Sequence, residues 1–308
     1  MKKTTASPVA LLCADLHLSD KPPLCRQEEP DWYAFQQDVL STVCDLSRQH
    51  KVPIVFAGDF FDKPRVSPQL EGMAIRTLQT SHAPWDAIPG QHDLFGHNLE
   101  NVDVGSFGVL VAAGVLQWVQ GSFPVFTGNS AYPIQFGEDI CSHKNPYVTI
   151  LITHRLAWMK EPYPGAPIDG NVKAILSATK AKLVVTGDNH HPFDYKAPNG
   201  QQIINCGTMM RRKADEEDII PSVVLLYDDL STKRIPICTP DTEHFTRPFV
   251  PLGKQGDTNE LEAFVQTLIS NDGAIAELSF DHVLERVAAE RKTSKQIISL
   301  IKEVQHAE

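Results

Sequence analysis

Short apolar runs that end in a turn carrying Asp or His recur along the first two-thirds of this chain. Five of these runs are predicted β-strands, because they are brief, apolar and bounded by Gly or polar residues. They are Val9–Cys13, Ile54–Ala57, Trp85–Ile88, Val148–Ile152 and Leu183–Thr186. A sheet brings the ends of its strands together, so we expect the polar residues that follow these runs to gather at one edge although they are distant in sequence.

Helical patterns separate the strands. Asp31 to His50 is a predicted helix with Asp31 as its N-cap, and Ser67-Pro68 begins a second helix that runs towards Ser81. This alternation of strands and helices predicts an α/β sheet. Residues 94–147 are less regular. Further elements are predicted as short helices near Val109–Ala113 and Val172–Thr179 and as strands at Gln201–Asn205, Ser222–Tyr227 and, more weakly, Arg234–Ile237.

The pattern changes towards the C-terminus. The stretch from Thr239 to Asn259 is rich in Pro, Gly and polar residues, which predicts a boundary between a domain at residues 1–240 and a helical module at residues 259–308. Apolar residues recur at helical spacing in the module, as at Leu261, Phe264 and Leu268. Short helices have little core of their own, so we expect the module to cap the main domain or to dock on a partner.

Composition and charge exclude several classes of protein. The 308 residues are 42% hydrophobic and 21% charged, as in an ordinary soluble globular protein. The net charge of −10 argues against a broad basic surface for nucleic acid, but it leaves room for a local basic patch or a partner that supplies the grip. No segment is apolar for long enough to span a membrane, and the six cysteines contain no C-x-x-C pair. We therefore expect a cytoplasmic protein that does not bind membranes.

Five motifs after the predicted strands carry the side chains of a two-metal phosphoesterase centre. Hydrolysis of a phosphate ester needs a hydroxide and positive charge at the phosphoryl oxygens, and two divalent ions about 3.5–4 Å apart supply both. Carboxylates mixed with imidazoles hold such a pair. The motifs are Asp15-Leu16-His17, Gly58-Asp59-Phe60-Phe61-Asp62, Gly90-Gln91-His92-Asp93, Thr153-His154 and Gly187-Asp188-Asn189-His190-His191. Each motif alone is a weak signal, but all five occur in order after strands.

In order and placement these motifs resemble the signature of the calcineurin-like metallophosphoesterases, over roughly residues 9 to 210. The resemblance implies a four-layer αββα sandwich with the metals at the sheet edge. It also implies the ligands: Asp15, His17 and His190 for the first ion, Gln91, His154 and Asp188 for the second, and Asp59 as the bridge. The implied catalytic residues are His92, beside the leaving group, and Asp93, which would orient His92. Asp62 is expected near the ligands rather than among them.

The chain departs from the family pattern at two implied ligands. Gln91 stands where the family usually has Asn, and Asp188 stands where the first His of Gly-His-x-His is expected. Both side chains offer oxygen, and Asp188 makes the second site more anionic. The expected cofactors are therefore two divalent ions, with Mn²⁺ first and Mg²⁺ as the alternative, rather than zinc.

Two further segments are similar to the SbcD-type DNA exonucleases of bacteria and phages. They are His97-Asn98-Leu99-Glu100-Asn101 and Asn205-Cys206-Gly207-Thr208-Met209-Met210-Arg211-Arg212. This similarity implies a nuclease in DNA repair, recombination or phage DNA processing, with DNA as substrate and an SMC-type ATPase as partner, and it leaves a homodimer open. His97 and Arg211 are candidate substrate contacts.

Plainer interpretations stand beside these candidates. His97 has an equal claim to being an exposed loop residue. The acidic run at residues 215–218 offsets the charge of Arg211 and its basic neighbours, so a solvated loop is as well supported as a phosphate contact. His191, beside Pro192, is expected to be a polar loop residue rather than a ligand.

The metal motifs do not choose between substrates. A phosphodiesterase or phosphatase for a small nucleotide or a phosphoprotein would need the same ions, and it is the alternative to the nuclease. A third hypothesis is a non-catalytic scaffold on the same fold. Such scaffolds usually lack ligands, whereas every ligand position here has a coordinating side chain and His92 is present. The leading prediction is a metal-dependent nuclease.

Overall fold

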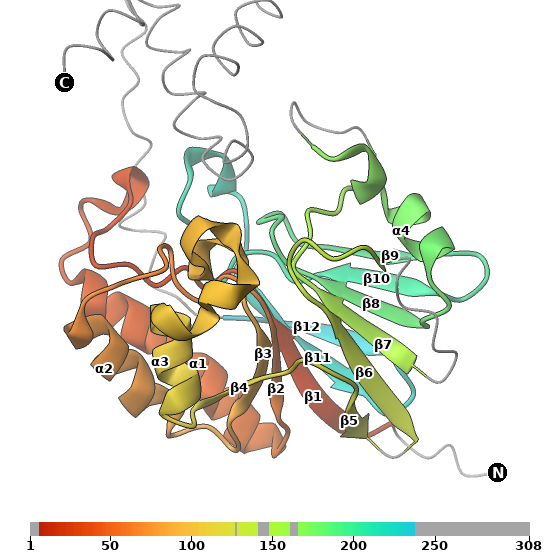
Figure 1. The fold of residues 1–308 in the computed structure, drawn as a ribbon, viewed down its shortest axis with the longest axis horizontal. Coiled ribbons are helices and arrows are strands. Elements are labelled where there is room, and N and C mark those ends of the chain that lie inside the picture. Colours follow the sequence, from red (N-terminus) through yellow and green to blue (C-terminus); the bar gives the residue numbers. More distant parts are fainter. Residues whose placement is uncertain (1–5, 127, 141–147, 161–165, 238–308) are drawn as a thin grey trace, which may run out of the picture. The chain divides into compact units, whose positions relative to one another are not determined.

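Two six-stranded sheets form the frame of the protein (Figure 1). The computed structural model describes residues 6–126, 128–140, 148–160 and 166–237. The strand order is β12-β11-β1-β2-β3-β4 in the first sheet and β5-β6-β7-β8-β10-β9 in the second. The helical module predicted at residues 259–308 lies outside the described residues, so the boundary near residue 240 stays a prediction.

The first sheet has a parallel centre. Its strands β1, β2, β3 and β4 are parallel neighbours, while β11 pairs antiparallel with β1 and β12 with β11. The bounds are β1 (Pro8–Cys13), β2 (Ile54–Ala57), β3 (Trp85–Ile88), β4 (Leu116–Trp118), β11 (Ser222–Tyr227) and β12 (Thr232–Pro236). The predicted strands of this sheet are confirmed apart from end shifts, and β4 was not predicted.

The second sheet also has parallel strands at its centre, with an antiparallel strand at each edge. Its strands are β5 (Phe123–Phe126), β6 (Asn129–Ile134), β7 (Val148–Thr153), β8 (Leu183–Thr186), β9 (Phe193–Lys196) and β10 (Gln202–Asn205). Residues 94–147, which lacked a strand pattern, contribute β4, β5 and β6. Pro124 and Pro133 lie inside two of these strands, where proline weakens the sequence signal for β-structure.

Four α-helices complete the described domain: α1 (Trp32–His50), α2 (Pro68–Leu78), α3 (Ser106–Ala112) and α4 (Val172–Ala178). Both predicted caps are present, since Asp31 accepts the backbone N–H of Ala34 at 2.9 Å and Ser67 accepts that of Leu70 at 3.2 Å. Helix α2 ends at Leu78, one turn before the predicted end. Helices α1 to α3 cover the first sheet and α4 covers the second (Figure 1). None of the described helices combines the length and hydrophobicity needed to cross a membrane.

Alternating side chains along buried strands create the layers. In β1, Leu11 belongs to the core under helices α1 to α3, whereas Leu12 belongs to the core between the sheets. In β8, Val184 lies in the core under α4 and Val185 in the core between the sheets. Both faces of the central strands are therefore buried, which explains their continuous apolar sequences. The expected four-layer αββα sandwich is confirmed.

Candidate metal centre

The turns after β1, β2, β3, β7 and β8 bring distant histidines and carboxylates together. Among the described residues, three groups of side chains each place one ligand atom per residue within 4.8 Å of the others. The groups are Asp15–His17–His190, Asp15–Asp59–His154 and His17–Asp59–His92. Because the groups share Asp15, His17 and Asp59, they form one continuous centre rather than separate sites.

Two histidines face each other on one side of the centre. The Nε2 atoms of His17 and His190 are 3.1 Å apart, and His17 Nε2 is 3.8 Å from Asp15 Oδ1. Two nitrogen ligands that share one ion at about 2.1 Å lie about 3 Å apart when their bonds are near perpendicular. The separation of the two imidazoles thus fits a shared ion.

Asp59 lies in the middle of the centre. Its Oδ2 is 3.1 Å from His154 Nε2 and 3.5 Å from His17 Nε2, and its Oδ1 accepts the backbone N–H of His92 at 2.9 Å. His17 and His154 belong to different sides of the centre. A carboxylate placed between them is in the position that a bridging ligand requires.

The two departures from the family pattern contact each other. Gln91 Nε2 donates to Asp188 Oδ1 at 2.7 Å, and the backbone N–H of Asp188 donates to the Asp15 carboxylate at 3.0 and 3.1 Å. On the same side, His154 Nδ1 is 2.6 Å from the carbonyl oxygen of Ala57, which leaves Nε2 to face Asp59. The second side of the centre therefore offers carboxylate and amide oxygens with a single imidazole.

Several buried lone pairs in this centre have no hydrogen-bond partner within the described chain. They belong to Asp59 Oδ2, Gln91 Oε1 and His154 Nε2. A buried polar atom without a partner costs about 1–3 kcal/mol, and a cation would satisfy all three. The residues present thus fit a pair of divalent ions.

Backbone strain is concentrated in the same turns. The φ angles are 54° at Asp15, 49° at His17, 60° at Asp59 and 73° at Asp188. These values lie in the left-handed region, which residues other than glycine seldom adopt. Glycine makes room beside them. A Cβ at Gly58 would lie 2.3 Å from His154 Nδ1, and a Cβ at Gly90 would lie 2.1 Å from Asp59 Oδ1.

The electrostatics of the centre favour added positive charge. Burial raises the pKa of Asp15 to about 7, although His154 and His190 act in the other direction. Burial would also raise the pKa of Asp59, but the positive charge that His154 carries when it is protonated outweighs this effect and holds that pKa below its usual value. Conversely, burial would lower the pKa of His154, but Asp59 raises it well above the usual value. A cation next to these carboxylates has the same stabilising effect as this imidazolium.

His92 lies beside the ligands, but its partner differs from the prediction. Its Nδ1 is 3.0 Å from the carbonyl oxygen of Asp62, and its ring centroid is 5.0 Å from that of His17. The Asp93 carboxylate instead accepts the backbone N–H groups of Phe60, Phe61 and Gly90 at 2.9–3.1 Å. Asp93 therefore fixes the turns around the centre, and the backbone of Asp62 orients His92.

The other predicted site residues lie outside the three metal-capable groups. His97 is half-buried, with its ring centroid 6.0 Å from that of Phe136. Arg211 is buried and donates to the carbonyl oxygen of Glu217 at 2.5 Å, which corrects its interpretation as a solvated loop residue. His191 is exposed, and its Nε2 is 3.5 Å from Asp215 Oδ2, in keeping with a loop residue.

No sequence pattern indicated that Glu216 and Arg212 lie beside the centre. Glu216 is fully buried, and its Oε1 lies 2.5 Å from His190 Nδ1. Arg212 Nη2 lies 2.7 Å from Asp62 Oδ1, and Arg212 Nη1 donates to the carbonyl oxygen of His17. Nothing in the acidic run 215–218 marks one of its four members as buried. Glu216 is buried because of the way in which the 3-10 turn Ala214–Glu216 packs against the rest of the domain, and this packing is a tertiary feature.

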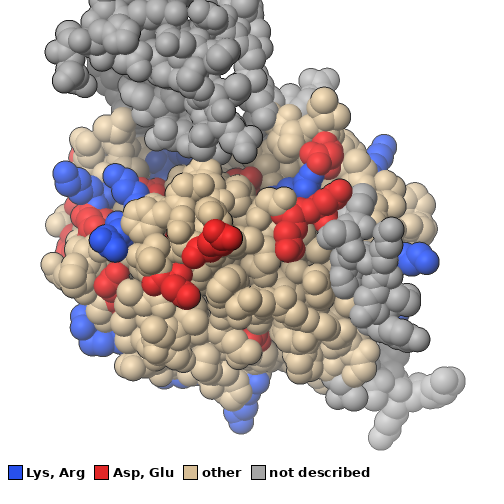
Figure 2. Space-filling view, in the orientation of Figure 1, with Lys and Arg blue, Asp and Glu red and all other residues tan. Residues whose placement is uncertain are grey.

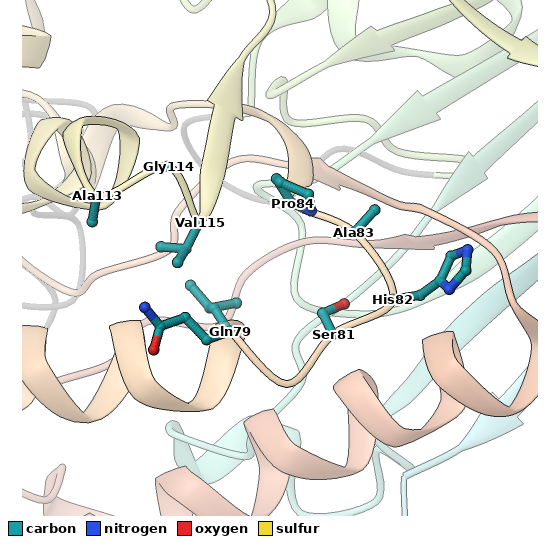
Figure 3. A pocket seen from close by; sticks show the side chains of 9 residues that line it. Gln79, Ser81, His82, Ala83, Pro84, Ala113, Gly114 and Val115 are labelled. Carbon is teal, nitrogen blue, oxygen red and sulfur yellow. The ribbon is translucent and has the colours of Figure 1, made fainter.

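A cavity of about 310 Å³ lies away from the centre (Figure 3). Its lining includes Ser81, His82 and Val115, which come from the segments before β3 and β4, whereas the metal-capable residues follow the carboxyl ends of strands. Strands β3 and β4 are parallel, so the cavity is at the opposite edge of the first sheet. Its lining residues include one histidine and no carboxylate, which is no ligand set for a metal.

A comparison with known protein families agrees with this architecture. The family model for calcineurin-like phosphoesterases matches residues 9–192. Among solved structures, a dimetal phosphatase from Danio rerio is similar with a TM-score of 0.46 and 11% identity, over 75% of this chain and 100% of that chain. The protein TT1561 of Thermus thermophilus gives a TM-score of 0.47 and 11% identity over the same shares. No curated protein sequence matches this chain.

The position of Asp59 generates a first prediction. We expect Asp59→Ala to lose both ions, because one carboxylate is shared between the two sides of the centre. Metal analysis of the purified protein and isothermal titration with Mn²⁺ measure this loss. Asp45→Ala, which removes an exposed carboxylate from α1, serves as the control. Full metal content in the Asp59 variant would show that the residue is not a bridge.

Proposed function

Because this chain belongs to the calcineurin-like phosphoesterase family, we propose that its metal-dependent phosphoesterase centre cleaves the phosphodiester bonds of DNA. The observation that carries the proposal is the convergence of unpartnered lone pairs on Asp59, Gln91 and His154 beside the imidazole of His92. Such a set binds ions and also places a proton donor next to them.

The proposal assigns the ligands as follows. Asp15, His17 and His190 would hold one ion, Gln91, His154 and Asp188 would hold the other, and Asp59 would be shared. Bound ions lower the pKa of a coordinated water and neutralise charge on the phosphoryl oxygens. The protein contributes the rigid turns that keep the ligand atoms of each metal-capable group within 4.8 Å of one another.

Burial indicates the side from which a substrate reaches the centre. Asp15, Asp59 and His154 are buried, whereas His92 and His190 are half-buried. A phosphodiester therefore approaches past the two half-buried histidines. As the oxygen of a hydroxide adds to phosphorus and the phosphorus–oxygen bond to the leaving group breaks, doubly protonated His92 transfers its Nε2 proton to the departing oxygen and becomes neutral. The carbonyl oxygen of Asp62 then stabilises the tautomer that keeps its proton on Nδ1.

The preference for DNA is supported by the similarity to SbcD-type exonucleases. One similar segment, residues 205–212, supports the centre directly, because the backbone N–H of Met209 donates to the carbonyl oxygen of Asp15 at 3.2 Å. On the described part of the face in Figure 2, acidic and basic side chains are interspersed and form no continuous basic surface. We therefore propose that an SMC-type ATPase partner supplies the grip on long DNA.

A substrate panel tests the proposed function. Purified protein is incubated with Mn²⁺ and bis-p-nitrophenyl phosphate, p-nitrophenyl phosphate, labelled single- and double-stranded DNA, cyclic nucleotides and a phosphopeptide. We expect hydrolysis of the chromogenic diester and of DNA. If the protein cleaves only the small nucleotides or the phosphopeptide, the nuclease proposal is wrong and the alternative substrate class replaces it.

His92 generates a further prediction. We expect His92→Ala to retain both ions and to lose about 10²–10⁴-fold in turnover, because it removes the proton donor without removing a ligand. Metal analysis and steady-state kinetics on the chromogenic diester separate the two effects. His191→Ala, which removes an exposed imidazole outside the three metal-capable groups, is the control. A parallel loss of metal and of rate would make His92 a ligand.

The Gln91–Asp188 pair generates a prediction about metal preference. We expect Mn²⁺ to support more activity than Zn²⁺, because the second side offers two oxygen ligands and one imidazole. The double variant Gln91→Asn, Asp188→His restores the family pattern and should shift the preference towards Zn²⁺. The effects of the two single variants on metal preference should not sum to the effect of the double variant, because the two side chains share a hydrogen bond. Highest activity of the unaltered protein with zinc would contradict the prediction.

A further inference from the structure

We propose that Glu216 is a positioning residue for the first metal ion, acting through His190. The inference deepens the proposed function, because it rests on the assignment of His190 as a ligand. It concerns a carboxylate outside the five sequence motifs, in the segment that follows the last of them. Three observations support it.

The first observation is the direct contact. Glu216 Oε1 lies 2.5 Å from His190 Nδ1, and the glutamate is fully buried. A carboxylate at this distance accepts the Nδ1 proton, which leaves the Nε2 lone pair free. That Nε2 atom is 3.1 Å from Nε2 of His17, on the side of the centre where the first ion would bind. Histidine ligands commonly have such a carboxylate behind them, which fixes the tautomer and the direction of the ring.

The second observation is that the carboxylate is itself fixed. Its other oxygen, Oε2, accepts the backbone N–H groups of Arg212 and Lys213 at 2.5 and 3.0 Å. Both oxygens of Glu216 are therefore occupied by donors. A side chain held in this way has one orientation, and it imposes that orientation on the imidazole.

The third observation is that the same segment is also anchored at the turn that carries His17. Arg212 forms an ion pair with Asp62 at 2.7 Å and donates to the carbonyl oxygen of His17. The segment thus contacts both predicted histidine ligands of the first ion, one through Glu216 and one through Arg212. Movement of Glu216 away from His190 would have to break these contacts.

Glu216→Gln is the sharpest variant because it keeps the size of the side chain. A glutamine has one acceptor and one donor group, whereas the site presents donors to both oxygens. In either orientation of the amide, its NH₂ group faces the Nδ1–H of His190 or the N–H groups of Arg212 and Lys213. Glu216→Asp keeps two acceptors but is shorter by one methylene, so it should fall between Glu216→Gln and the unaltered protein.

The experiment measures metal affinity and the state of His190 in the full chain. Isothermal titration with Mn²⁺ should show about 10–100-fold weaker binding at one of two sites in Glu216→Gln, with the other site unchanged. Nitrogen-15 NMR of histidine-labelled, metal-free protein should show that His190 loses its preference for the Nδ1–H tautomer. A residue that only supports the fold would not change the tautomer of one histidine in a folded protein.

Two further variants separate the possible outcomes. Asp215→Asn removes one negative charge from the same turn at an exposed position, and it should leave both the affinity and the tautomer unchanged. His190→Ala should weaken the same site as Glu216→Gln. If His190→Ala has no effect on metal binding, the ligand assignment fails and the inference with it. If His190→Ala weakens the site but Glu216→Gln and Glu216→Asp do not, only the positioning role is overturned. An unchanged tautomer in a folded Glu216→Gln protein overturns it as well.

Discussion

Two buried carboxylates, Asp15 and Asp59, impose the constraint on which the rest of the structure depends. Each is at most 1% exposed, and an ionised group at such a position is stable only when positive charge or hydrogen-bond donors surround it. Imidazoles, backbone N–H groups and divalent ions are the groups that can do so here. The five turns that meet at this edge supply the imidazoles and the backbone N–H groups. They also leave lone pairs to which divalent ions can bind.

The turns can hold this arrangement because a large core supports them. Left-handed backbone angles at Asp15, His17, Asp59 and Asp188 cost about 1–3 kcal/mol each. The apolar layers on both faces of each sheet offset that cost, since they fix the strands to which the turns are attached. The strained turns of the centre therefore depend on the apolar core beneath them. The arrangement also requires glycine at positions 58 and 90, because any side chain there would displace His154 or Asp59.

The neighbourhood of the centre shows how similar residues acquire different roles. Asp62 pairs with Arg212 and presents its carbonyl oxygen to His92, whereas Asp93 binds three backbone N–H groups and fixes the turns. Arg211 is buried against the backbone of Glu217, while the next residue, Arg212, reaches the His17 turn. Consecutive side chains of one type differ in function here because the backbone directs them to different surroundings.

The sequence by itself determined the architecture and the set of candidate ligands. Short apolar runs followed by Asp or His identify strand ends, and the strand order of a parallel sheet brings those ends together whatever their separation along the chain. Local patterns also predicted the caps of α1 and α2, because capping depends on residues within one turn. Only the tertiary structure decided which partner each polar side chain has. Three contacts show this: Gln91 with Asp188, His92 with the carbonyl oxygen of Asp62, and His190 with buried Glu216. Each contact joins two segments that no sequence pattern relates to each other. Such contacts arise from the three-dimensional approach of loops, and a pattern read along the chain carries no information about it.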